Sequence, residues 1–358
     1  MQTTSSTRTD KRTLPIGYKL HWYVIKDVLG QGGFGITYLA EDMNLKKDVA
    51  IKEFLPREIA TRNDDLTVRS LHEGVTERLQ WGLDRFIQEG RTLSRFDHPN
   101  IVKVHSVFEA NNTAYMVMSY EQGKTFVERL KDGEQLTEEE LMKLIMSILD
   151  GLEEMHGEGF IHRDIKPGNI FIRKDKTPLL LDFGSARQAM NDETMTLTMM
   201  VTPGYAPVEQ YYGKSDVQGP WTDIYSLGAT IFRAITGEPP VDATFRNRLS
   251  RDKAIEEMWN TLVTYSDRYS LVFLRAIEHS LRQNYKDRPQ TVEEWRLMFT
   301  DPSVSTDTQW RLNDQSKEGR VAALQRFGKN WVKPVLYAVL VGAVIAVGLL
   351  WYLNHQLG

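Results

Sequence analysis

The chain has 358 residues, with 44 Lys and Arg against 48 Asp and Glu, so its formal net charge is −4. This balance excludes a nucleic-acid-binding module that depends on bulk positive charge, and we expect no nucleic-acid partner. The sequence contains no cysteine, which excludes disulfide scaffolds, thiolate zinc sites and cysteine nucleophiles.

The sequence divides into a polar start, a folded region and an apolar end. Residues 1–17 are rich in Ser, Thr and charge, so we expect a disordered tail and no signal peptide there. A folded region is predicted over residues 18–299. The residues after it, 300–332, are polar and contain several Ser and Thr, which is typical of a linker.

The first part of the folded region, about 18–120, is predicted to be mostly strands. Runs such as WYVIKDVL and TAYMVMSY are rich in β-branched and aromatic residues. One helix interrupts them, in which Leu83, Phe86 and Leu93 recur at intervals that place them on one face. Glu89 lies on or beside that face, where a carboxylate needs a partner.

The second part, about 121–299, is predicted to be helical. Thr137 and Glu140 form a T-x-x-E capping box in front of an apolar stripe that runs from Leu141 to Met155. Glycines after the stripe end this helix. The predicted fold class is therefore α+β, with a small β-rich part followed by a larger helical part.

Residues 334–353 form a run of 20 residues without one charge. A helix of this length spans about 30 Å, the thickness of a bilayer core. Trp331 and Tyr337 lie near one end and Trp351 and Tyr352 near the other, as interfacial aromatic residues do. We predict one transmembrane helix over 333–353 and a short tail over 354–358. The alternative is a buried core helix.

Residues 30–35 read G-x-G-x-x-G, a pattern that alone is weak. It can open the helix of a dinucleotide-binding unit or join two strands. The run that follows, from Ile36 to Ala40, is strand-like, so we expect a glycine turn between strands. Such a turn lets backbone amides approach phosphates closely.

Two further groups of residues carry candidate chemistry. Lys52 closes an apolar strand, where it is either a surface lysine or, paired with Glu89, a ligand for phosphate. Asp164 and Asn169 lie in a H-R-D-I-K-P-G-N run, and Asp182 opens a D-F-G directly after an apolar strand. Carboxylate and amide oxygens of this kind suit Mg²⁺.

Together these motifs resemble the eukaryotic-type protein kinase family over residues 23–299. The runs GQGGFGITYLAED and IKEFLP resemble the PknB-like group of bacterial Ser/Thr kinases. The resemblance implies a bilobal fold, with an N-lobe over about 18–120 and a C-lobe over about 121–299. It also implies ATP and Mg²⁺ (or Mn²⁺) as cofactors and protein Ser/Thr hydroxyls as substrates.

The same resemblance implies roles for individual residues. Asp164 would orient the substrate hydroxyl, Lys166 would contact the transferred phosphoryl group, and Lys52 would hold phosphates and pair with Glu89. Asn169 and Asp182 would bind the metal ion. The residues implied around ATP are Leu29, Gly30, Gln31, Gly32, Gly33, Phe34, Gly35, Thr37, Ala50, Lys52, Met118 and Tyr120.

The resemblance departs from the family pattern in two places. The A-P-E motif carries one inserted residue, Val208, although Glu209 is still expected to pair with Arg288. Lys52 and Glu89 are separated by 36 intervening residues, which leaves room for an extra short strand and turn of unknown purpose.

The loop before the A-P-E motif contains the predicted regulatory residues. A phosphate on this loop could pair with Arg163. The candidate acceptors are Thr194, Thr196 and Thr198, and the alternative is three solvated loop threonines. Thr202 is expected to form part of the floor on which the substrate lies, and Asp223 to brace the catalytic loop.

The charges beside the apolar run set the expected topology. Arg320, Arg326, Lys329 and Lys333 precede it and no Lys or Arg follows it. The positive-inside rule then places the kinase domain in the cytoplasm, on a single-pass anchor in the inner membrane, with the C-terminus outside. Small residues four apart, at positions 338, 342 and 346, either pack a homodimer or are ordinary for a membrane helix.

Two classes of function remain open at this point. The first is an active Ser/Thr protein kinase that phosphorylates itself and signals from the membrane. The second is a membrane-anchored pseudokinase or scaffold that binds nucleotide without transfer, against which the intact Lys52, Asp164, Asn169 and Asp182 weigh. A dinucleotide-dependent oxidoreductase is undercut by the strand after Gly35.

Overall fold

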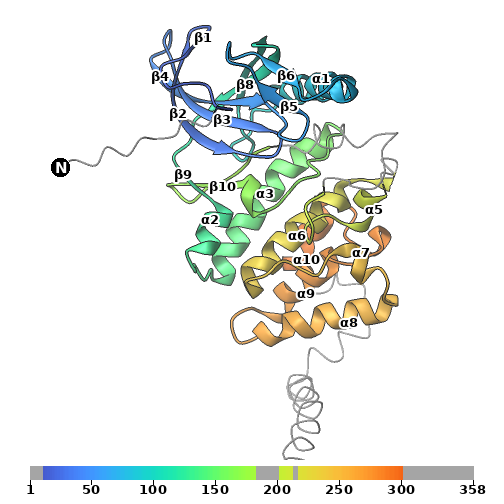
Figure 1. Cartoon of the computed structure of the whole chain (residues 1–358). Coiled ribbons are helices and arrows are strands. Elements are labelled where there is room, and N and C mark those ends of the chain that lie inside the picture. Colours follow the sequence, from blue (N-terminus) through green and yellow to red (C-terminus); the bar gives the residue numbers. More distant parts are fainter. Residues whose placement is uncertain (1–10, 183–200, 213–216, 301–358) are drawn as a thin grey trace, which may run out of the picture. The chain divides into compact units, whose positions relative to one another are not determined.

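The computed structural model describes residues 11–182, 201–212 and 217–300 (Figure 1). The chain forms two compact units, Met1–Thr300 and Asp301–Gly358. All of the second unit lies outside the described residues, and so do the predicted transmembrane helix, the tail and all of the predicted linker except Thr300, which belongs to the last described helix.

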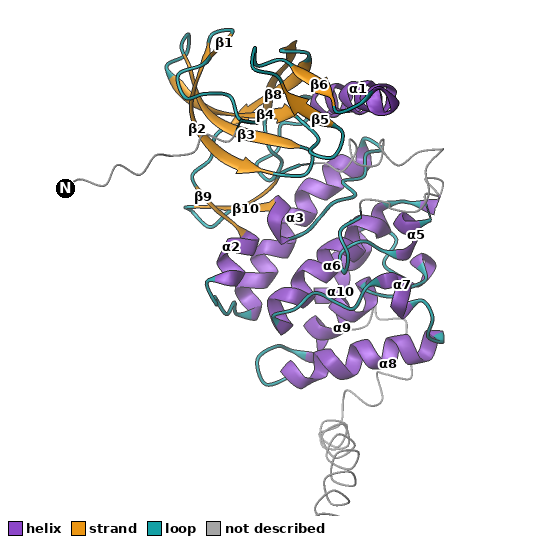
Figure 2. Cartoon of the chain, in the orientation of Figure 1, coloured by secondary structure: helices purple, strands orange, loops and turns teal. Residues whose placement is uncertain are grey.

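The N-lobe is built on a six-stranded antiparallel sheet in the order β1-β2-β3-β4-β8-β7 (Figure 2). Along β3, buried residues alternate with half-exposed ones, so one face of the sheet covers a core. The strands are β1 (Lys19–Leu20), β2 (Tyr23–Gln31), β3 (Gly35–Asp42), β4 (Lys47–Phe54), β7 (Val104–Ala110) and β8 (Thr113–Ser119).

The predicted N-lobe helix is confirmed as α1 (Thr76–Leu93), which packs on β7 and β8. Leu83, Phe86 and Leu93 are buried on its inner face, and Glu89 is buried with them. Gly90 is required on that face, because a Cβ there would lie 2.4 Å from a methyl carbon of Val107.

The interval between Lys52 and Glu89 holds a two-stranded hairpin of β5 (Ala60–Arg62) and β6 (Val68–Ser70). A single helical turn, η1 (Glu73–Val75), connects this hairpin to α1. The extra strand expected from the sequence is therefore a pair of strands, and it leads directly into the N-lobe helix.

The prediction of a disordered tail over residues 1–17 is wrong for residues 11–17. Leu14 is 1% exposed and belongs to the N-lobe core cluster. Its backbone N–H donates to the hydroxyl of Tyr38 at 3.1 Å. The folded domain therefore begins before Tyr18, because a buried apolar side chain and several hydrogen bonds, such as that from Gly17 N–H to the carbonyl of Ile25 at 2.7 Å, fix this segment against the sheet.

The C-lobe is mainly helical, as the sequence predicts. The capping box at Thr137 and Glu140 is present at the start of α3, whose stripe from Leu141 to Met155 is buried. The main helices are α2 (Phe126–Lys131), α3 (Glu138–Gly157), α5 (Val208–Tyr211), α6 (Pro220–Thr236), α7 (Ala243–Arg246), α8 (Arg251–Leu262), α9 (Leu271–Ser280) and α10 (Val292–Thr300).

The C-lobe also contains a small three-stranded sheet, in the order β11-β10-β9. Its strands are β9 (Gly123–Thr125), β10 (Ile170–Arg173) and β11 (Pro178–Leu180). The N-lobe segment at Asn100 and Val102 hydrogen-bonds to β11: the amide of Asn100 donates to the carbonyl of Pro178 at 2.7 Å, and Val102 N–H to that of Leu180 at 3.0 Å. These bonds join the two lobes behind the catalytic loop.

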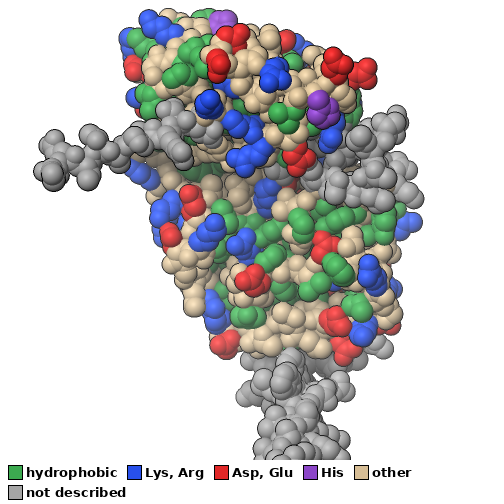
Figure 3. Space-filling view, viewed as in Figure 1, with side chains coloured by type: hydrophobic (Ala, Val, Ile, Leu, Met, Phe, Trp, Pro, Cys, Tyr) green, Lys and Arg blue, Asp and Glu red, His purple; other side chains and the backbone are tan. Residues whose placement is uncertain are grey.

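On the face shown in Figure 3, Lys and Arg side chains are interspersed with Asp and Glu on both lobes. Within the ranges that the structure describes, no helix is long and apolar enough to cross a bilayer.

Leu14→Ala should lower the free energy of unfolding by about 2–5 kcal/mol, because it removes a fully buried side chain from the core. Ile16→Ala is the matched control, since Ile16 is 72% exposed, and we expect a change of no more than about 0.5 kcal/mol. Urea unfolding of both variants measures this difference. Equal midpoints would show that residues 11–17 do not belong to the folded domain.

Candidate active site

The catalytic residues predicted from the H-R-D-I-K-P-G-N run converge on Asp164, which is buried in the loop between α3 and β10. The ammonium group of Lys166 donates to both of its carboxylate oxygens, at 3.0 and 2.9 Å. The amide of Asn169 donates to the same carboxylate at 2.7 Å, and the Thr202 hydroxyl at 3.0 Å. Thr202 therefore lies within the site, in contact with Asp164. The sequence predicts that it forms part of the surface on which the substrate lies.

The backbone of this loop is held by Asp223, a fully buried carboxylate on α6. Asp223 accepts hydrogen bonds at 2.8 Å from the N–H groups of His162 and Arg163 and from the ring of His156. Arg163 has a φ of 67°, a left-handed conformation that is unfavourable for a residue with a side chain. The bonds to Asp223 stabilise that turn, which directs Asp164 into the site.

Burial alone would raise the pKa of Asp223. The hydrogen bonds from the ring of His156 and from the Arg163 N–H outweigh it and hold that pKa below the usual value for aspartate. The carboxylate that braces the loop is therefore ionised at neutral pH.

His162 is buried, and its ring makes one hydrogen bond through each of its two nitrogens. Its Nε2 lies 2.9 Å from the carbonyl oxygen of Leu181, so it is the protonated nitrogen, and its Nδ1 accepts from the Asp164 N–H at 3.3 Å. Burial lowers the pKa of His162, although the carboxylates of Asp223 and Asp164 oppose the change.

Lys52 and Asp182 meet across the two lobes. The Lys52 ammonium, on β4, donates to a carboxylate oxygen of Asp182 at 2.7 Å. Asp182 follows β11, and the Asn169 amide donates to its backbone carbonyl at 3.5 Å. Glu89 is buried on α1. Its pairing with Lys52 stays a prediction.

Asn169 and Asp182 are suited to a magnesium ion. The amide nitrogen of Asn169 is used by Asp164, which leaves its oxygen as a donor to metal, and the side chain of Asp182 is 43% exposed. Mg²⁺ in proteins is held by one or two carboxylates together with water and substrate phosphates. These residues therefore fit a Mg²⁺ ion that arrives with a nucleotide.

The glycine run forms the turn between β2 and β3, with Gly32 N–H donating to the Gly35 carbonyl at 2.8 Å. Strand β3 begins at Gly35, so the dinucleotide-binding alternative, which needs a helix there, is wrong. A Cβ on Gly35 would lie 2.0 Å from the backbone oxygen of Glu53, so only glycine fits.

The remaining residues expected around ATP lie on the strands beside this turn. Thr37 pairs with Lys52 across β3 and β4, and Ala50 pairs with Met118 across β4 and β8. Ala50 and Met118 are buried, Tyr120 is half-buried at the end of β8, and Leu29 is exposed. Gly30, Gln31, Gly32 and Gly33 are exposed, and Phe34 is half-buried.

The expected anchor of the activation segment is present. The guanidinium of Arg288 donates twice to Glu209, at 2.6 and 3.1 Å, and both side chains are buried. The inserted residue, Val208, is accommodated at the start of α5. Thr194, Thr196, Thr198, Phe183 and Gly184 lie outside the described residues.

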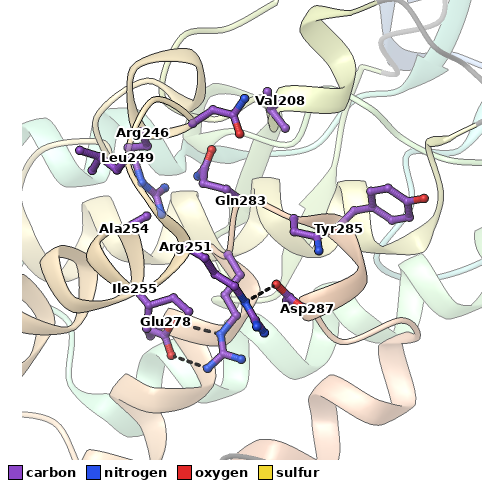
Figure 4. A pocket seen from close by; sticks show the side chains of 13 residues that line it. Val208, Arg246, Leu249, Arg251, Ala254, Ile255, Glu278, Gln283, Tyr285 and Asp287 are labelled. Atoms are coloured by element: carbon purple, nitrogen blue, oxygen red, sulfur yellow. Dashed lines mark hydrogen bonds and ion pairs between the residues drawn. The ribbon is translucent and has the colours of Figure 1, made fainter.

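Val208 lines a cavity of about 410 Å³ in the C-lobe (Figure 4). Two ion pairs lie among its lining residues, between Arg282 and Glu278 and between Arg251 and Asp287. None of the residues expected around ATP lines this cavity, so it is distinct from the nucleotide site.

Sequence reasoning missed two buried partners near the site. Glu53, next to Lys52, forms an ion pair with Arg62 of the hairpin, and both side chains are inaccessible to solvent. The signal in the sequence is a carboxylate among apolar residues, which needs a partner when it is buried. Glu53 in its strand meets this condition in the same way as Glu89 on its helix.

Comparison with known proteins agrees with this geometry. Residues 23–296 match the protein kinase domain family. The chain is 31% identical over 280 residues to the serine/threonine-protein kinase pkn2 of Myxococcus xanthus, covering 74% of this chain and 30% of that protein. It is 32% identical over 220 residues to PrkC of Bacillus subtilis, covering 62% of this chain and 31% of that protein.

Solved structures give the same result. The apo form of PpkA-294 superposes with a TM-score of 0.73 at 37% identity, covering 80% of this chain and 99% of that one. A structure of Rad53 1-466 in complex with AMP-PNP shares the fold, with a TM-score of 0.56 at 22% identity, covering 77% of this chain and 65% of that one.

The fold and the site define a protein kinase domain of the serine/threonine type. The chain belongs to the protein kinase family. It spans between 30% and 47% of the length of the curated relatives pkn2 of Myxococcus xanthus and PknA of Nostoc.

The neutral state of His162 can be tested by pH titration. Its ring should stay in the Nε2-protonated neutral form at pH 6, where a free imidazole with a pKa of about 6.5 is mostly charged. Because the folded-state pKa is lowered, the neutral ring contributes stability above about pH 6.5, and this contribution is lost as the pH falls through the lowered value. Side-chain ¹H–¹⁵N spectra report the form directly, and a doubly protonated ring at pH 6 would contradict the assignment.

Proposed function

We propose that this chain transfers the γ-phosphoryl group of ATP, with Mg²⁺ or Mn²⁺, to Ser and Thr hydroxyls of proteins, including its own. The observation that carries the proposal is the group of contacts at Asp164. A carboxylate, an ammonium and a threonine hydroxyl lie within hydrogen-bond distance of one another there.

The positions of these side chains suit the reaction. Asp164 accepts a hydrogen bond from a hydroxyl, as it does from Thr202, and so orients a substrate oxygen for attack. Lys166, next to it, neutralises charge on the transferred group as the bond to the leaving oxygen breaks. Bound ATP supplies the phosphoryl group, and the divalent ion offsets its charge.

Lys52 and Asp182 would act on the phosphates of ATP and on the metal ion. Lys52 is placed to contact phosphate oxygens from the N-lobe, while Asp182 and Asn169 offer oxygen ligands to the metal from the C-lobe. Phosphoryl transfer depends mainly on positioning and electrostatic stabilisation, which these residues provide.

The alternative is a pseudokinase or scaffold that binds nucleotide without transferring phosphate. The charged groups at the site favour the active enzyme. All of them are used in phosphoryl transfer, whereas binding of a nucleotide does not require all of them. Nucleotide binding without transfer is the outcome that would favour the alternative.

We also propose that residues 333–353 anchor the domain in the inner membrane, with the kinase on the cytoplasmic side and the C-terminus outside. The uncharged run of 20 residues and the basic residues before it support this topology. Small residues on one face of the run support self-association in the membrane. Within the proposal, autophosphorylation uses Thr194, Thr196 or Thr198 and a contact to Arg163.

Asp164→Asn should lower kcat for phosphate transfer by about 10²–10⁴-fold, because it removes the group that orients the hydroxyl. The assay follows labelled ATP onto a generic basic protein and onto the chain itself, and phosphoamino acid analysis and mass spectrometry identify the acceptors. Asp175→Asn is the matched control, since Asp175 is an exposed turn residue on the same lobe. Equal activity of parent and Asp164→Asn would reject the assignment, and phosphotyrosine as the main product would reject the substrate class.

Removal of residues 333–353 should release the protein from membranes prepared from expressing cells. Fractionation followed by a carbonate wash measures this, because an integral helix resists the wash. Gly342→Leu should leave the chain in the membrane but reduce its self-association in a membrane two-hybrid assay. Full-length protein in the wash supernatant would reject the anchor, and unchanged association would reject the dimer.

A further inference from the structure

The hairpin between Lys52 and Glu89 places a guanidinium inside the N-lobe. The side chain of Arg62, at the end of β5, is inaccessible to solvent and forms an ion pair with Glu53. Its remaining nitrogens donate to the backbone carbonyls of Arg12 at 2.7 Å and Leu66 at 2.8 Å. One arginine therefore holds the hairpin, the N-terminal segment and β4 together.

Glu53 is next to Lys52 in β4, and neighbouring side chains of a strand point to opposite faces. Besides Arg62, the Glu53 carboxylate accepts from the hydroxyls of Tyr38 at 2.9 Å and Tyr115 at 2.5 Å. Burial, assisted by the charge of Glu53, raises the pKa of both phenols, so both remain donors at neutral pH. The carboxylate is fixed by three donors from three different elements.

The same network reaches the glycine turn. Arg12 donates to the carbonyl of Leu55 at 3.0 Å, and the N–H of Leu55 donates to the carbonyl of Phe34 in the turn at 3.0 Å. The N–H of Arg57 donates to the carbonyl of Gly33 at 2.8 Å. The end of β4 after Lys52 is thus bonded to the turn on one side and to the hairpin network on the other.

The hairpin also leads into α1, beside which it lies in Figure 2. The hydroxyls of Ser70 and Thr76 are 2.9 Å apart at this junction, and Val68 N–H donates to the carbonyl of Asn111 at the β7–β8 turn at 2.8 Å. A shift of the hairpin would therefore move both the start of α1 and the end of β4.

We propose that Arg62 and Glu53 are positioning residues for nucleotide binding. They orient the Lys52 strand and the glycine turn so that both can contact the phosphates of the same nucleotide. The proposal rests on the ATP use proposed above. A buried ion pair contributes little net stability compared with apolar residues, because desolvation offsets the attraction. A guanidinium and a carboxylate do, however, fix orientation through directed hydrogen bonds, which suits a positioning role.

Arg62→Met should weaken binding of a non-hydrolysable ATP analogue with Mg²⁺ by about tenfold, or about 1.4 kcal/mol, because the Lys52 strand and the glycine turn lose the contact that orients them toward the phosphates. Isothermal titration calorimetry on the full chain measures the Kd, at a temperature well below the unfolding midpoint of each variant. Arg62→Lys, which keeps the charge facing Glu53, should recover part of the loss. Arg69→Met is the matched control, because Arg69 is exposed on the same hairpin, and its Kd should equal that of the parent.

A folded Arg62→Met variant with the parental Kd, and parental KM and kcat, would overturn the proposal and leave the pair a purely structural role. If Arg62→Met does not fold, Tyr115→Phe tests the same network, because it removes one donor to Glu53 and leaves both charges in place. We expect a weakening of about fivefold from one lost hydrogen bond, and an unchanged Kd would overturn the proposal.

The two proposals fail in different ways. A parent that binds the analogue but transfers no phosphate would reject the proposed function and leave the positioning role to be decided by the Kd values. A parent that transfers phosphate, with Kd values equal in all variants, would reject only the positioning role.

Discussion

The active site depends on one buried carboxylate, Asp223 of α6. It receives two backbone N–H groups of the catalytic loop and the ring of His156, each at 2.8 Å. A buried carboxylate is tolerated only when its hydrogen bonds are satisfied, so α3, α6 and the loop are held in one arrangement. The left-handed turn at Arg163 persists because of these bonds, and it is this turn that directs Asp164 toward Lys166, Asn169 and Thr202.

The charges of the site explain why a divalent ion must accompany the nucleotide. Lys52 and Lys166 are matched by Asp182 and Asp164, so these four side chains are balanced before any ligand binds. A triphosphate adds several negative charges to a partly buried space, which is unfavourable unless a cation enters with it. Asp182 and Asn169 would hold such an ion through their side-chain oxygens, because the Asn169 nitrogen is already used by Asp164 and the Asp182 carboxylate is partly exposed.

Much of this site could be predicted because its residues are close in the sequence. The glycine turn, the loop from His162 to Asn169 and the A-P-E variant are local patterns whose geometry follows from a few residues. The contact between Lys52 and Asp182 joins residues 130 apart, and only the family resemblance anticipated that both belong to one site. The prediction for residues 11–17 was wrong because it rested on their polar composition, whereas the buried side chain of Leu14 belongs to the N-lobe core.

The hairpin network was not predicted, because Arg62 lies in no motif and nothing local in the sequence identifies it as the partner of Glu53 in the I-K-E-F-L-P run. The pair formed by Glu53 and Arg62 can be compared with the pair formed by Glu209 and Arg288. Each pair is a buried guanidinium on a buried carboxylate, one between β4 and the hairpin and one between α5 and the loop after α9. Buried pairs add little to stability but restrict orientation strongly. Each pair therefore fixes two separate segments of its own lobe against one another: β4 against the hairpin in the N-lobe, and α5 against the loop after α9 in the C-lobe.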